Sequence, residues 1–493
     1  MSIMKPAHRW QPAWRPFKRE TLGNRTLMAV ERAFKGPVYG CRMCGNCLLQ
    51  ETAFICPMEC PKGLRNGPCG GSTPEFCYVD ESRPCVWYKI YERAFAMGRE
   101  EKLLEVLPPL DWEQVGGETW GGVFRQTQEV GIGNFVSGLR DPQTRHDTWE
   151  SVFEPLRQPE WWQGDAEYHP ATYDEPASDL ERRLRAGEFV VTSEVAPPLG
   201  SATAKLERET DMIKPYVAAV NFTDCPSATP RMSSLACSMK ALEHDAEPVM
   251  QIAARDRTRV GVQAEVMGAS ALGIRNMLCL SGDSPAIGPA PRSRMEVVDI
   301  ESVHLLWMLR RMRDEGHYLD GRNIKTPPMY FLGAAASPYA SRPEFQAIRE
   351  HKKVNAGAQF FQTNLVYDPK GLEIWLDSLA QRDILDKVYV LIGITPLKSY
   401  KMARYMHDSV PGVSIPEPLL QRLENAGDGV MEEGVQITLE LIDQIKGMEG
   451  VNGFHLMPVM WEAIVPRIVT EAGLLPPDFV APENHTELIT VGG

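Results

Sequence analysis

EFVVTSEVAPPLGSATAKLERETDMIKPYVAAVNFTD, residues 188–224, holds an apolar run, an amphipathic stretch and a second apolar run. The first run, 188–196, and the second, 217–224, are rich in Val, Thr and Phe, which favour β-strands. The stretch 203–216 between them spaces its apolar residues as one face of a helix does. Two parallel strands need such a crossover helix between them. The segment therefore predicts a strand–helix–strand unit of a parallel sheet.

The same alternation continues to about residue 475. We expect strands at 188–196, 217–224, 248–256, 274–283, 329–337, 359–367, 387–395 and 452–459. We expect helices at 203–216, 230–244, 259–272, 299–315, 344–356 and 371–385, and two more within 416–448. The strands are almost continuously apolar, as in strands buried on both faces. Eight such units predict an α/β fold, a (β/α)8 TIM barrel. A doubly wound open sheet is the alternative, but no G-x-G-x-x-G motif follows the first strand to favour it.

Eight of the 11 cysteines crowd into residues 41–85, in the spacing C-x2-C-x2-C-x8-C-x3-C-x8-C-x7-C-x7-C. They are Cys41, Cys44, Cys47, Cys56, Cys60, Cys69, Cys77 and Cys85. Thiolates this close together form disulfides, hold zinc or hold iron–sulfur clusters. The first twenty residues lack the apolar segment of a secretory signal, so we expect a cytoplasmic protein with reduced thiols and a metal site. The other three, Cys225, Cys237 and Cys279, are expected to be small buried hydrophobes, with Cys225 at the barrel mouth.

The spacing of the eight cysteines bears on which metal they hold. Structural zinc favours C-x2-4-C pairs, and Cys56 with Cys60 could form one. The evenly spaced triplet Cys41, Cys44 and Cys47 suits a [4Fe–4S] cluster whose fourth ligand comes from elsewhere. Eight thiolates could supply two such clusters, or one cluster and a zinc ion. We expect iron–sulfur, with zinc as the alternative.

Composition narrows the class of protein further. The chain has 493 residues, 43% of them hydrophobic and 24% charged, as in ordinary globular proteins. A net charge of −13 argues against nucleic acid as the main partner. No run of apolar residues is long enough for a membrane span. The first forty residues are locally basic and form either a solvated arm or a docking site for an acidic electron carrier.

We divide the chain into three parts. Residues 1–100 form the small cysteine-rich metal-binding domain, and residues 185–493 form the barrel. Residues 101–184 show no clear periodicity and carry five tryptophans, Trp112, Trp120, Trp149, Trp161 and Trp162. That is too much tryptophan for a disordered linker. We expect an irregular connecting segment that packs on both neighbours.

Polar residues stand at the carboxyl ends of the predicted strands, where a TIM barrel builds its active site. Asp224 and Asp256 are as well explained as helix caps. Glu194 is different, because it follows the apolar run of the first strand and precedes Val-Ala-Pro-Pro. A carboxyl so placed is expected to be half-buried, which raises its pKa and suits it to acid–base catalysis.

Several of these strand ends resemble motifs of methylenetetrahydrofolate reductases. TSEVAPP at 192–198 is similar to the first-strand motif of that family, and LSGDSP at 280–285 to its fourth-strand motif. KKVNAGAQFFQTNLVYD at 352–368 is similar to its sixth-strand region. The cysteine segment, CRMCGNCLL…CPMECPKGLRNGPCGG, resembles the small cysteine-rich partner subunit of such reductases in acetogenic bacteria, fused here at the N-terminus.

The resemblance implies a barrel that binds FAD and reduces 5,10-methylenetetrahydrofolate to 5-methyltetrahydrofolate. Glu194 would be the general acid that protonates the departing nitrogen of the folate ring, and Asp283 would lie near the flavin and the folate. The cofactor-binding residues that it implies are Asn221, Gln251, Leu280, Ser281, Gly282, Lys353 and Ala358. Asn364 and Tyr400 would contact substrate. Asn364 stands where the family has Gln, Ser281 where it has Arg, and Tyr400 aligns only loosely with an aromatic residue that stacks on the nicotinamide cofactor in members that use NADH.

Fusion of a cluster-type cysteine segment to a flavin barrel suggests an electron route. We expect electrons to come from a ferredoxin-like protein or a flavoprotein rather than from NADH. The sequence leaves a homo-oligomer open. The rival functions are an NAD(P)H-dependent reductase with a structural zinc domain, a zinc–thiolate methyltransferase acting on folate, and a non-catalytic interaction protein.

Overall fold

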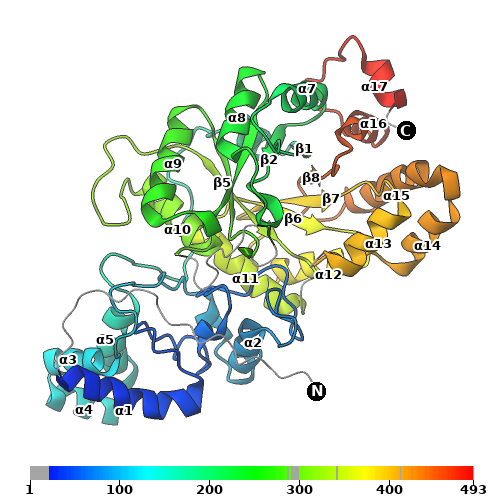
Figure 1. Cartoon of the computed structure of the whole chain (residues 1–493). Helices are drawn as coiled ribbons and strands as arrows, with labels where there is room; N and C mark the ends of the chain where they lie inside the picture. The colour runs from blue at the N-terminus through cyan, green and yellow to red at the C-terminus, as the bar shows by residue number, and fades with distance from the viewer. Residues whose placement is uncertain (1–21, 286–287, 290–298, 340–341, 411, 492–493) are drawn as a thin grey trace.

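The computed structural model describes residues 22–285, 288–289, 299–339, 342–410 and 412–491, and its larger part is a closed barrel of eight parallel strands (Figure 1). The strands are β1 (Val190–Val195), β2 (Ala219–Phe222), β3 (Pro248–Ala253), β4 (Asn276–Leu280), β5 (Phe331–Ala336), β6 (Phe360–Leu365), β7 (Tyr389–Ile394) and β8 (Gly453–Leu456). They pair in chain order, and β8 closes on β1 through Val190 beside Gly453. The predicted strands and the predicted (β/α)8 barrel are confirmed.

Helices cover the outside of the barrel, as the alternating pattern predicted. They are α7 (Ala204–Ile213), α8 (Ser234–Glu243), α9 (Arg259–Ala271), α10 (Ser302–Asp314), α11 (Pro343–Ala356), α12 (Pro369–Ala380), α13 (Tyr400–Ser409), α14 (Glu417–Asn425), α15 (Val430–Ile445), α16 (Val465–Glu471) and α17 (His485–Val491). The two helices expected within 416–448 are α14 and α15. Helix α13 was not predicted, because only Ala403 and Met406 of its ten residues are buried.

The inside of the barrel is layered, and the layers show which side chains face the mouth. Val190, Ala219, Val249, Leu278, Phe331, Phe360 and Leu391 form one apolar cluster, and Leu180 and Leu184 of helix α6 (Asp179–Arg185) join it. This cluster fills the amino end of the barrel. Side chains alternate along a strand, so residues two and four positions later share the inward face. The inward face therefore turns polar toward the carboxyl end.

The first part of the chain is more helical than expected. It contains α1 (Leu22–Tyr39), α2 (Val86–Ala96), α3 (Trp120–Val130), α4 (Ile132–Arg140) and α5 (Arg145–Arg157), besides long loops that carry the cysteines. The prediction of an irregular segment at 101–184 was wrong, because α3, α4, α5 and α6 lie within it. In α3 and α4 no residue is fully buried. Residues 1–21, which include most of the predicted basic arm, lie outside the described residues.

Helices α1, α3, α4 and α5 group together at one end of the molecule, whereas α2 lies next to the barrel (Figure 1). The tryptophans of the connecting segment contact both neighbours, as predicted. Trp149 Nε1 donates to Gln50 Oε1 at 2.8 Å in the cysteine-rich part. Trp162 lies 6.5 Å from Trp307 of α10, measured between ring centroids.

The cysteine-rich part is bound to the barrel by an aromatic contact and by buried hydrogen bonds. Phe345 at the start of α11 packs against the rings of Tyr88, Tyr91 and Phe95 from α2, with centroid distances of 5.0–6.3 Å. Glu301 Oε1 accepts hydrogen bonds from the backbone N–H groups of residues 65 and 66 at 2.9 and 2.6 Å. Such buried contacts fix how the two parts sit on each other.

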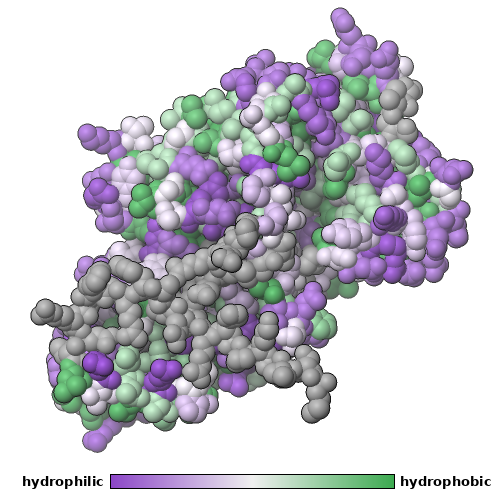
Figure 2. All heavy atoms as spheres, viewed as in Figure 1, coloured by the Kyte–Doolittle hydropathy of each residue, from purple (hydrophilic) through white to green (hydrophobic). Residues whose placement is uncertain are grey.

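The surface in the view of Figure 2 mixes hydrophilic and hydrophobic residues, with hydrophilic residues gathered over helices α13, α14 and α15. Exposed ion pairs account for part of this, such as Arg422 with Glu440 at 2.6 Å. Within the described ranges, none of the helices has the length and apolar character that crossing a membrane requires.

Candidate active site at the barrel mouth

Glu194 lies on the inward face of β1 at the carboxyl end of the barrel. Its side chain is 20% exposed, so it sits inside the mouth and can still be reached from it. Burial, and after it the negative charge of Glu462, raises the pKa of Glu194 from its ordinary value of 4.5 to about 7. A carboxyl group with this pKa exists in both protonation states near neutral pH. It can therefore act as a general acid, as its place in the sequence predicted.

Two side chains from the end of β8 flank Glu194. Glu462 is buried in the single turn Glu462–Ile464 that follows the strand. His455 Nε2 lies 3.9 Å from Glu194 Oε2, but burial lowers the pKa of His455 to about 3. The imidazole is therefore neutral at pH 7 and forms no ion pair with Glu194. The neighbouring charge that Glu194 meets is negative, which favours its protonated form.

A ring of hydrogen bonds crosses the barrel below Glu194. Gln362 Nε2 donates to Thr192 Oγ1 and to Asn221 Oδ1, both at 3.1 Å, and Asn221 Nδ2 donates to Gln362 Oε1 at 2.6 Å. Thr192 Oγ1 also pairs with His455 Nδ1 at 2.9 Å. These side chains are all buried. The ring forms a rigid floor under the mouth, and the amide of Asn221, expected to bind cofactor, is engaged in this floor.

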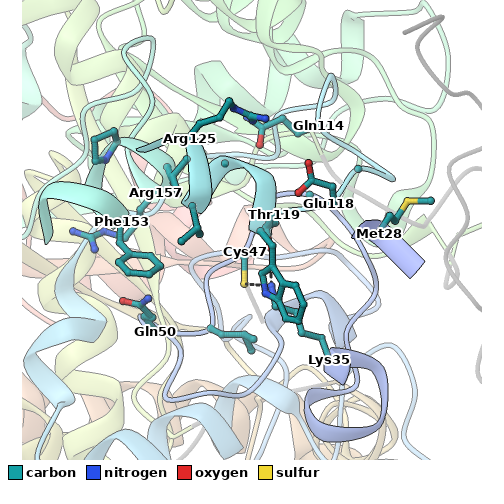
Figure 3. A pocket seen from close by; sticks show the side chains of 18 of the residues that line it. Met28, Lys35, Cys47, Gln50, Gln114, Glu118, Thr119, Arg125, Phe153 and Arg157 are labelled. Carbon is teal, nitrogen blue, oxygen red and sulfur yellow. Dashed lines mark hydrogen bonds between the residues drawn. The ribbon is translucent and has the colours of Figure 1, made fainter. Parts of the chain in front are cut away.

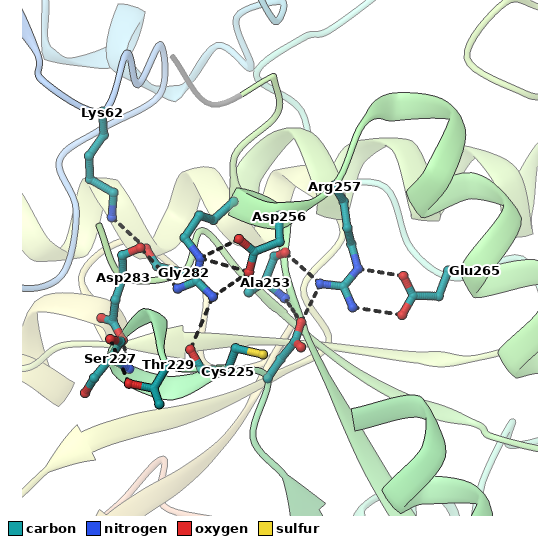
Figure 4. A network of polar contacts seen from close by, with 12 residues as sticks. Lys62, Cys225, Ser227, Thr229, Ala253, Asp256, Arg257, Glu265, Gly282 and Asp283 are labelled. Carbon is teal, nitrogen blue, oxygen red and sulfur yellow. Dashed lines mark hydrogen bonds and ion pairs between the residues drawn. The ribbon is translucent and has the colours of Figure 1, made fainter. Parts of the chain in front are cut away.

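Asp283 lies just beyond the end of β4 and accepts hydrogen bonds from two loops. Tyr78 Oη, from the cysteine-rich part, donates to Asp283 Oδ1 at 3.1 Å. The backbone N–H of Ser227 donates to Asp283 Oδ2 at 2.7 Å (Figure 4). Cys225 and Ser227 both have positive φ, of 48° and 53°, which non-glycine residues rarely adopt. Such backbone strain is concentrated at functional sites, and here it turns the N–H group of Ser227 toward the carboxylate.

Arginine side chains hold the outside of this rim together. Arg255 donates to the carbonyl oxygens of Asp283 and Cys225 at 3.1 and 3.2 Å, and pairs with Asp256 (Figure 4). Arg257 bridges Asp224 and Glu265. Asp224 and Asp256 are therefore ion-pair partners rather than the helix caps that the sequence suggested. Ser233 caps α8, and Thr258 caps α9.

The cysteine-rich part reaches the same rim through Lys62. Its Nζ donates to the carbonyl oxygen of Gly282 at 2.7 Å (Figure 4). The same atom lies 5.7 Å from the centre of the Tyr78 ring. Gly282 has φ +80°, and a Cβ atom there would lie 3.0 Å from Arg255 Cβ, so this position favours glycine. Lys62 and Tyr78 thus place the cysteine-rich part directly against the predicted catalytic carboxylate.

The structure brings several other predicted residues to the mouth. Gln251, Leu280 and Asn364 lie on the inward faces of β3, β4 and β6, toward the carboxyl ends of these strands. Ser281 follows β4, but its hydroxyl accepts from the backbone N–H of Ser302 at 3.0 Å and so binds the start of α10. Tyr400 begins α13 after the carboxyl end of β7, on the mouth side.

One predicted cofactor contact, Ala358, is not brought to the mouth, and a second, Lys353, is engaged in buried hydrogen bonds near the carboxyl end of β5. Ala358 is buried at the amino end of β6, which is the opposite end of the barrel. Lys353 is buried between α11 and β5, where its Nζ donates to the Ala335 carbonyl oxygen and to Glu350 Oε2, both at 2.6 Å. Burial lowers the pKa of Lys353 to about 8.

The eight clustered cysteines separate into two sets of four. Cys41, Cys44, Cys47 and Cys56 line one small cavity. Lys35 Nζ lies 3.7 Å from Cys47 Sγ at its edge. Burial, and after it the charge of Cys44, raises the pKa of Cys56 to about 12. The two thiols are therefore close enough to interact electrostatically. All four are free thiols.

The second set is Cys60, Cys69, Cys77 and Cys85, which line another small cavity together with Lys62. Burial is the main cause that raises the pKa of Cys85, to about 11, and the charge of Cys69 adds to it. These four are also free thiols. In the described part of the chain, no three or more His, Cys, Asp or Glu side chains are arranged to hold a single metal ion. Cys237 and Cys279 are buried away from both sets, as predicted.

Comparison with known proteins agrees with this geometry. A protein-family profile described as methylenetetrahydrofolate reductase matches residues 179–473, which is more than half of the chain. The chain belongs to the methylenetetrahydrofolate reductase family. A second profile, described as methylene-tetrahydrofolate reductase C terminal, matches residues 21–113. The resemblance of the cysteine segment to a small partner subunit stays a prediction.

Two curated relatives are methylenetetrahydrofolate reductases 2 and 1 of Schizosaccharomyces pombe. The first is 24% identical over 333 residues, covering 63% of this chain and 49% of the relative. The second is 23% identical over 261 residues, covering 50% and 39%. The chain thus spans half or less of the length of these relatives. A solved structure of a Clostridium thermocellum protein, described as binding two copies of 5-methyl-5,6,7,8-tetrahydrofolic acid, is 16% identical with a TM-score of 0.42 over 60% of this chain and 98% of that one.

Within this methylenetetrahydrofolate reductase family barrel, sequence reasoning missed four residues at the mouth. His455 lies near the end of β8, where the rule that located Glu194 could have found it. Glu462 lies in the turn Glu462–Ile464 that follows the strand, beyond the reach of that rule. Lys62 and Tyr78 carried no such signal, because they lie in a loop whose position depends on the docking of the two parts.

Proposed function

We propose that the chain reduces 5,10-methylenetetrahydrofolate to 5-methyltetrahydrofolate at the barrel mouth, with FAD bound there and electrons delivered through two iron–sulfur clusters in residues 41–85. The observation that carries this proposal is Glu194, a mouth carboxyl whose pKa is raised to about 7. The folate ring must open before its methylene carbon can accept a hydride, and opening requires a proton on the departing nitrogen. Glu194 supplies that proton near neutral pH.

The mouth residues support FAD by the chemistry of the groups they present. Gln251 and Asn364 carry amides that can both donate and accept, as the polar edge of a flavin ring requires. Lys62 adds a cation on the rim beside Asp283, where negative charge on a reduced flavin would be stabilised. Leu280 contributes an apolar contact between these groups. We propose that these residues hold the flavin, with Asn364 also facing the folate.

The cysteine sets support iron–sulfur clusters by their number and surroundings. Four free thiols around one cavity, twice over, match the four cysteine ligands of each cluster. The buried Arg65 carries positive charge beside Cys44 and Cys47, and Lys35 does so at Cys47, which offsets thiolate charge. When bound, the clusters would supply single electrons and FAD would supply the hydride.

The order of the two sets along the electron route follows from their positions. The second set shares its cavity with Lys62, which contacts Gly282 at the barrel mouth. The first set has Cys47, an exposed thiol, at its edge. We therefore place the first set at the entrance for electrons and the second set next to the barrel. The donor would be a ferredoxin-like protein or a flavoprotein.

An absorbance spectrum with iron, zinc and flavin analysis of the anaerobically purified chain tests the cofactors. The expected result is a brown-yellow protein with FAD and about eight iron atoms per chain, whose flavin NADH reduces poorly. Zinc with FAD, and rapid reduction of the flavin by NADH, would instead favour the NAD(P)H-dependent reductase. Zinc without flavin would favour the methyltransferase.

Glu194→Gln tests the catalytic carboxyl. Loss of a general acid is expected to slow oxidation of the reduced enzyme by methylenetetrahydrofolate by about 10²- to 10⁴-fold. Reduction of the flavin by dithionite should be nearly unchanged, because that half-reaction needs no proton on folate. Glu440→Gln, on the outer face of α15, is the matched control and should leave both half-reactions unchanged. Equal damage to the two half-reactions in Glu194→Gln would refute the role as acid.

A further inference from the structure

A large cavity lies in the first part of the chain, away from the barrel mouth. Its volume is about 1020 Å³, and it is lined by α1, α3, α5 and the loops that carry the first cysteine set (Figure 3). Small-molecule and cofactor sites occupy about 300–1,000 Å³. The cavity therefore has room for a nucleotide-sized ligand, and the barrel reaction makes no use of it.

Aromatic rings line two sides of this cavity. On one side Trp120 of α3 lies 6.1 Å from Phe34 of α1, between ring centroids. On the other side Trp149 stacks on Phe153 of α5 at 4.3 Å. Flat aromatic side chains favour stacking with another planar ring. The ligand that suits these walls contains a planar aromatic ring system.

The charged groups around the cavity are unevenly paired. Arg157 forms ion pairs with Glu51, Glu105 and Glu150. Arg25 and Arg125 also line the cavity, and neither forms an ion pair with another described residue. Arginine binds phosphate through its planar fork of donors. A phosphate group on the ligand would give the guanidinium groups of Arg25 and Arg125 an anionic partner.

The large cavity adjoins the first cysteine set at Cys47. This cysteine lines both the large cavity and the small cavity shared by Cys41, Cys44 and Cys56. Lys35 also lines both, and donates to Thr119 Oγ1 at 2.7 Å (Figure 3). It also donates to Glu31 Oε1 at 2.6 Å. A planar ligand in the large cavity would therefore lie beside the proposed entrance for electrons.

We propose that this cavity binds a second flavin nucleotide, which passes electrons to the first cysteine set; the assignment rests on the proposed function. A nicotinamide gives up a hydride, which an iron–sulfur cluster cannot accept, whereas a reduced flavin gives up its electrons singly. A flavin held here would supply two electrons, one to each cluster that the cysteine sets would hold, and would release its two protons to water. The external protein donor would reduce it again.

Titration of the purified holoenzyme with FMN tests the site. We expect one FMN to bind per chain in addition to the barrel flavin, with quenching of its fluorescence by stacking on tryptophan. Trp120→Ala and Arg125→Ala should each weaken this binding by about tenfold, the equivalent of one good stacking or charged contact. Trp112→Ala and Arg140→Ala, at positions that do not line the cavity, are the matched controls and should bind FMN as the unchanged chain does.

The outcomes separate this inference from the proposed function. If the barrel flavin is present and no second, saturable FMN site exists, the inference is wrong and the barrel function stands. If a second site exists but Trp120→Ala and Arg125→Ala bind as tightly as their controls, the cavity is not that site and the inference is again wrong. If purified protein lacks a barrel flavin, yet FMN binding depends on Trp120 and Arg125, the cavity assignment stands and the barrel proposal fails.

Discussion

Replacing Glu462 by Gln is expected to move the pH dependence of folate reduction toward acid. Glu194 must be protonated to donate, so the rate is full below its pKa and falls tenfold for each pH unit above it. In the unchanged chain this pKa is about 7, because burial and the charge of Glu462 both raise it. Glutamine keeps the size of the side chain and removes its charge, so Glu194 ionises more easily in the variant.

The size of the change follows from the order of the two causes. Together they raise the pKa of Glu194 from 4.5 to about 7, and burial is the larger. The charge of Glu462 therefore accounts for less than half of that difference, so removing it should lower the pKa of Glu194 by at most about one pH unit, equivalent to about 1.4 kcal/mol. The Glu462→Gln variant should match the unchanged chain at pH 5.5 and be up to about tenfold slower at pH 8.

The assay is stopped-flow oxidation of the dithionite-reduced enzyme by methylenetetrahydrofolate between pH 5.5 and 9. A second-order rate constant at low folate reports ionisation of the free enzyme. Glu440→Gln is a suitable control, since that exposed carboxylate in the middle of α15 pairs with Arg422 of α14. A midpoint that stays near pH 7 in Glu462→Gln, or moves to higher pH, would show that Glu462 does not tune the acid.

Three further changes test the domain contacts and the cysteine sets. Cys56→Ser and Cys77→Ser should each remove about half of the bound iron, because each variant breaks one set of four cysteines. The buried control Cys237→Ser should remove none. Loss of all iron from both variants would argue against two separate sites. Tyr78→Phe removes a hydroxyl donor from the mouth carboxylate. A hydrogen bond to a charged group is worth about 1.5–3 kcal/mol, so folate reduction should slow by about 10- to 100-fold. An unchanged rate would contradict a role at the mouth. Glu301→Ala leaves two buried backbone N–H groups of the cysteine-rich part without their acceptor, at a cost of about 2–4 kcal/mol. The variant should melt at a lower temperature, and its cysteine-rich part should be cleaved more readily by proteases. Melting and cleavage like those of the unchanged chain would refute the proposed role of Glu301.

The barrel could be predicted because its strands are apolar on both faces and its crossovers are regular. The same regularity placed Glu194, Gln251 and Asn364 at the carboxyl end, since position along a parallel strand decides which end of the barrel a side chain occupies. It failed for Ala358, which follows a helix rather than a strand and so lies at the opposite end. The family resemblance supplied that residue, but the topology excludes it from the mouth.

Contacts between distant segments could not be predicted in this way. The spacing of the cysteines suggested eight ligands, but their division into two sets depends on how the loops fold back. Helices α3 and α4 were hidden because they bury little and contain glycine, which lowers helix propensity. Tyr78 contacts Asp283 across 205 positions of sequence, and nothing local to either residue signals the pair.

Helix α11 has a consequence for how the molecule can be divided. In a solitary barrel one side of each outer helix meets water, but 11 of the 14 residues of α11 are buried, including Phe345 and Ile348 beneath α2. A barrel expressed alone, from residue 185 onward, would expose the apolar surface around Phe345 and Ile348 to solvent and should aggregate. Co-expression of residues 1–184 as a separate polypeptide should restore solubility, because the two pieces would meet as obligate subunits.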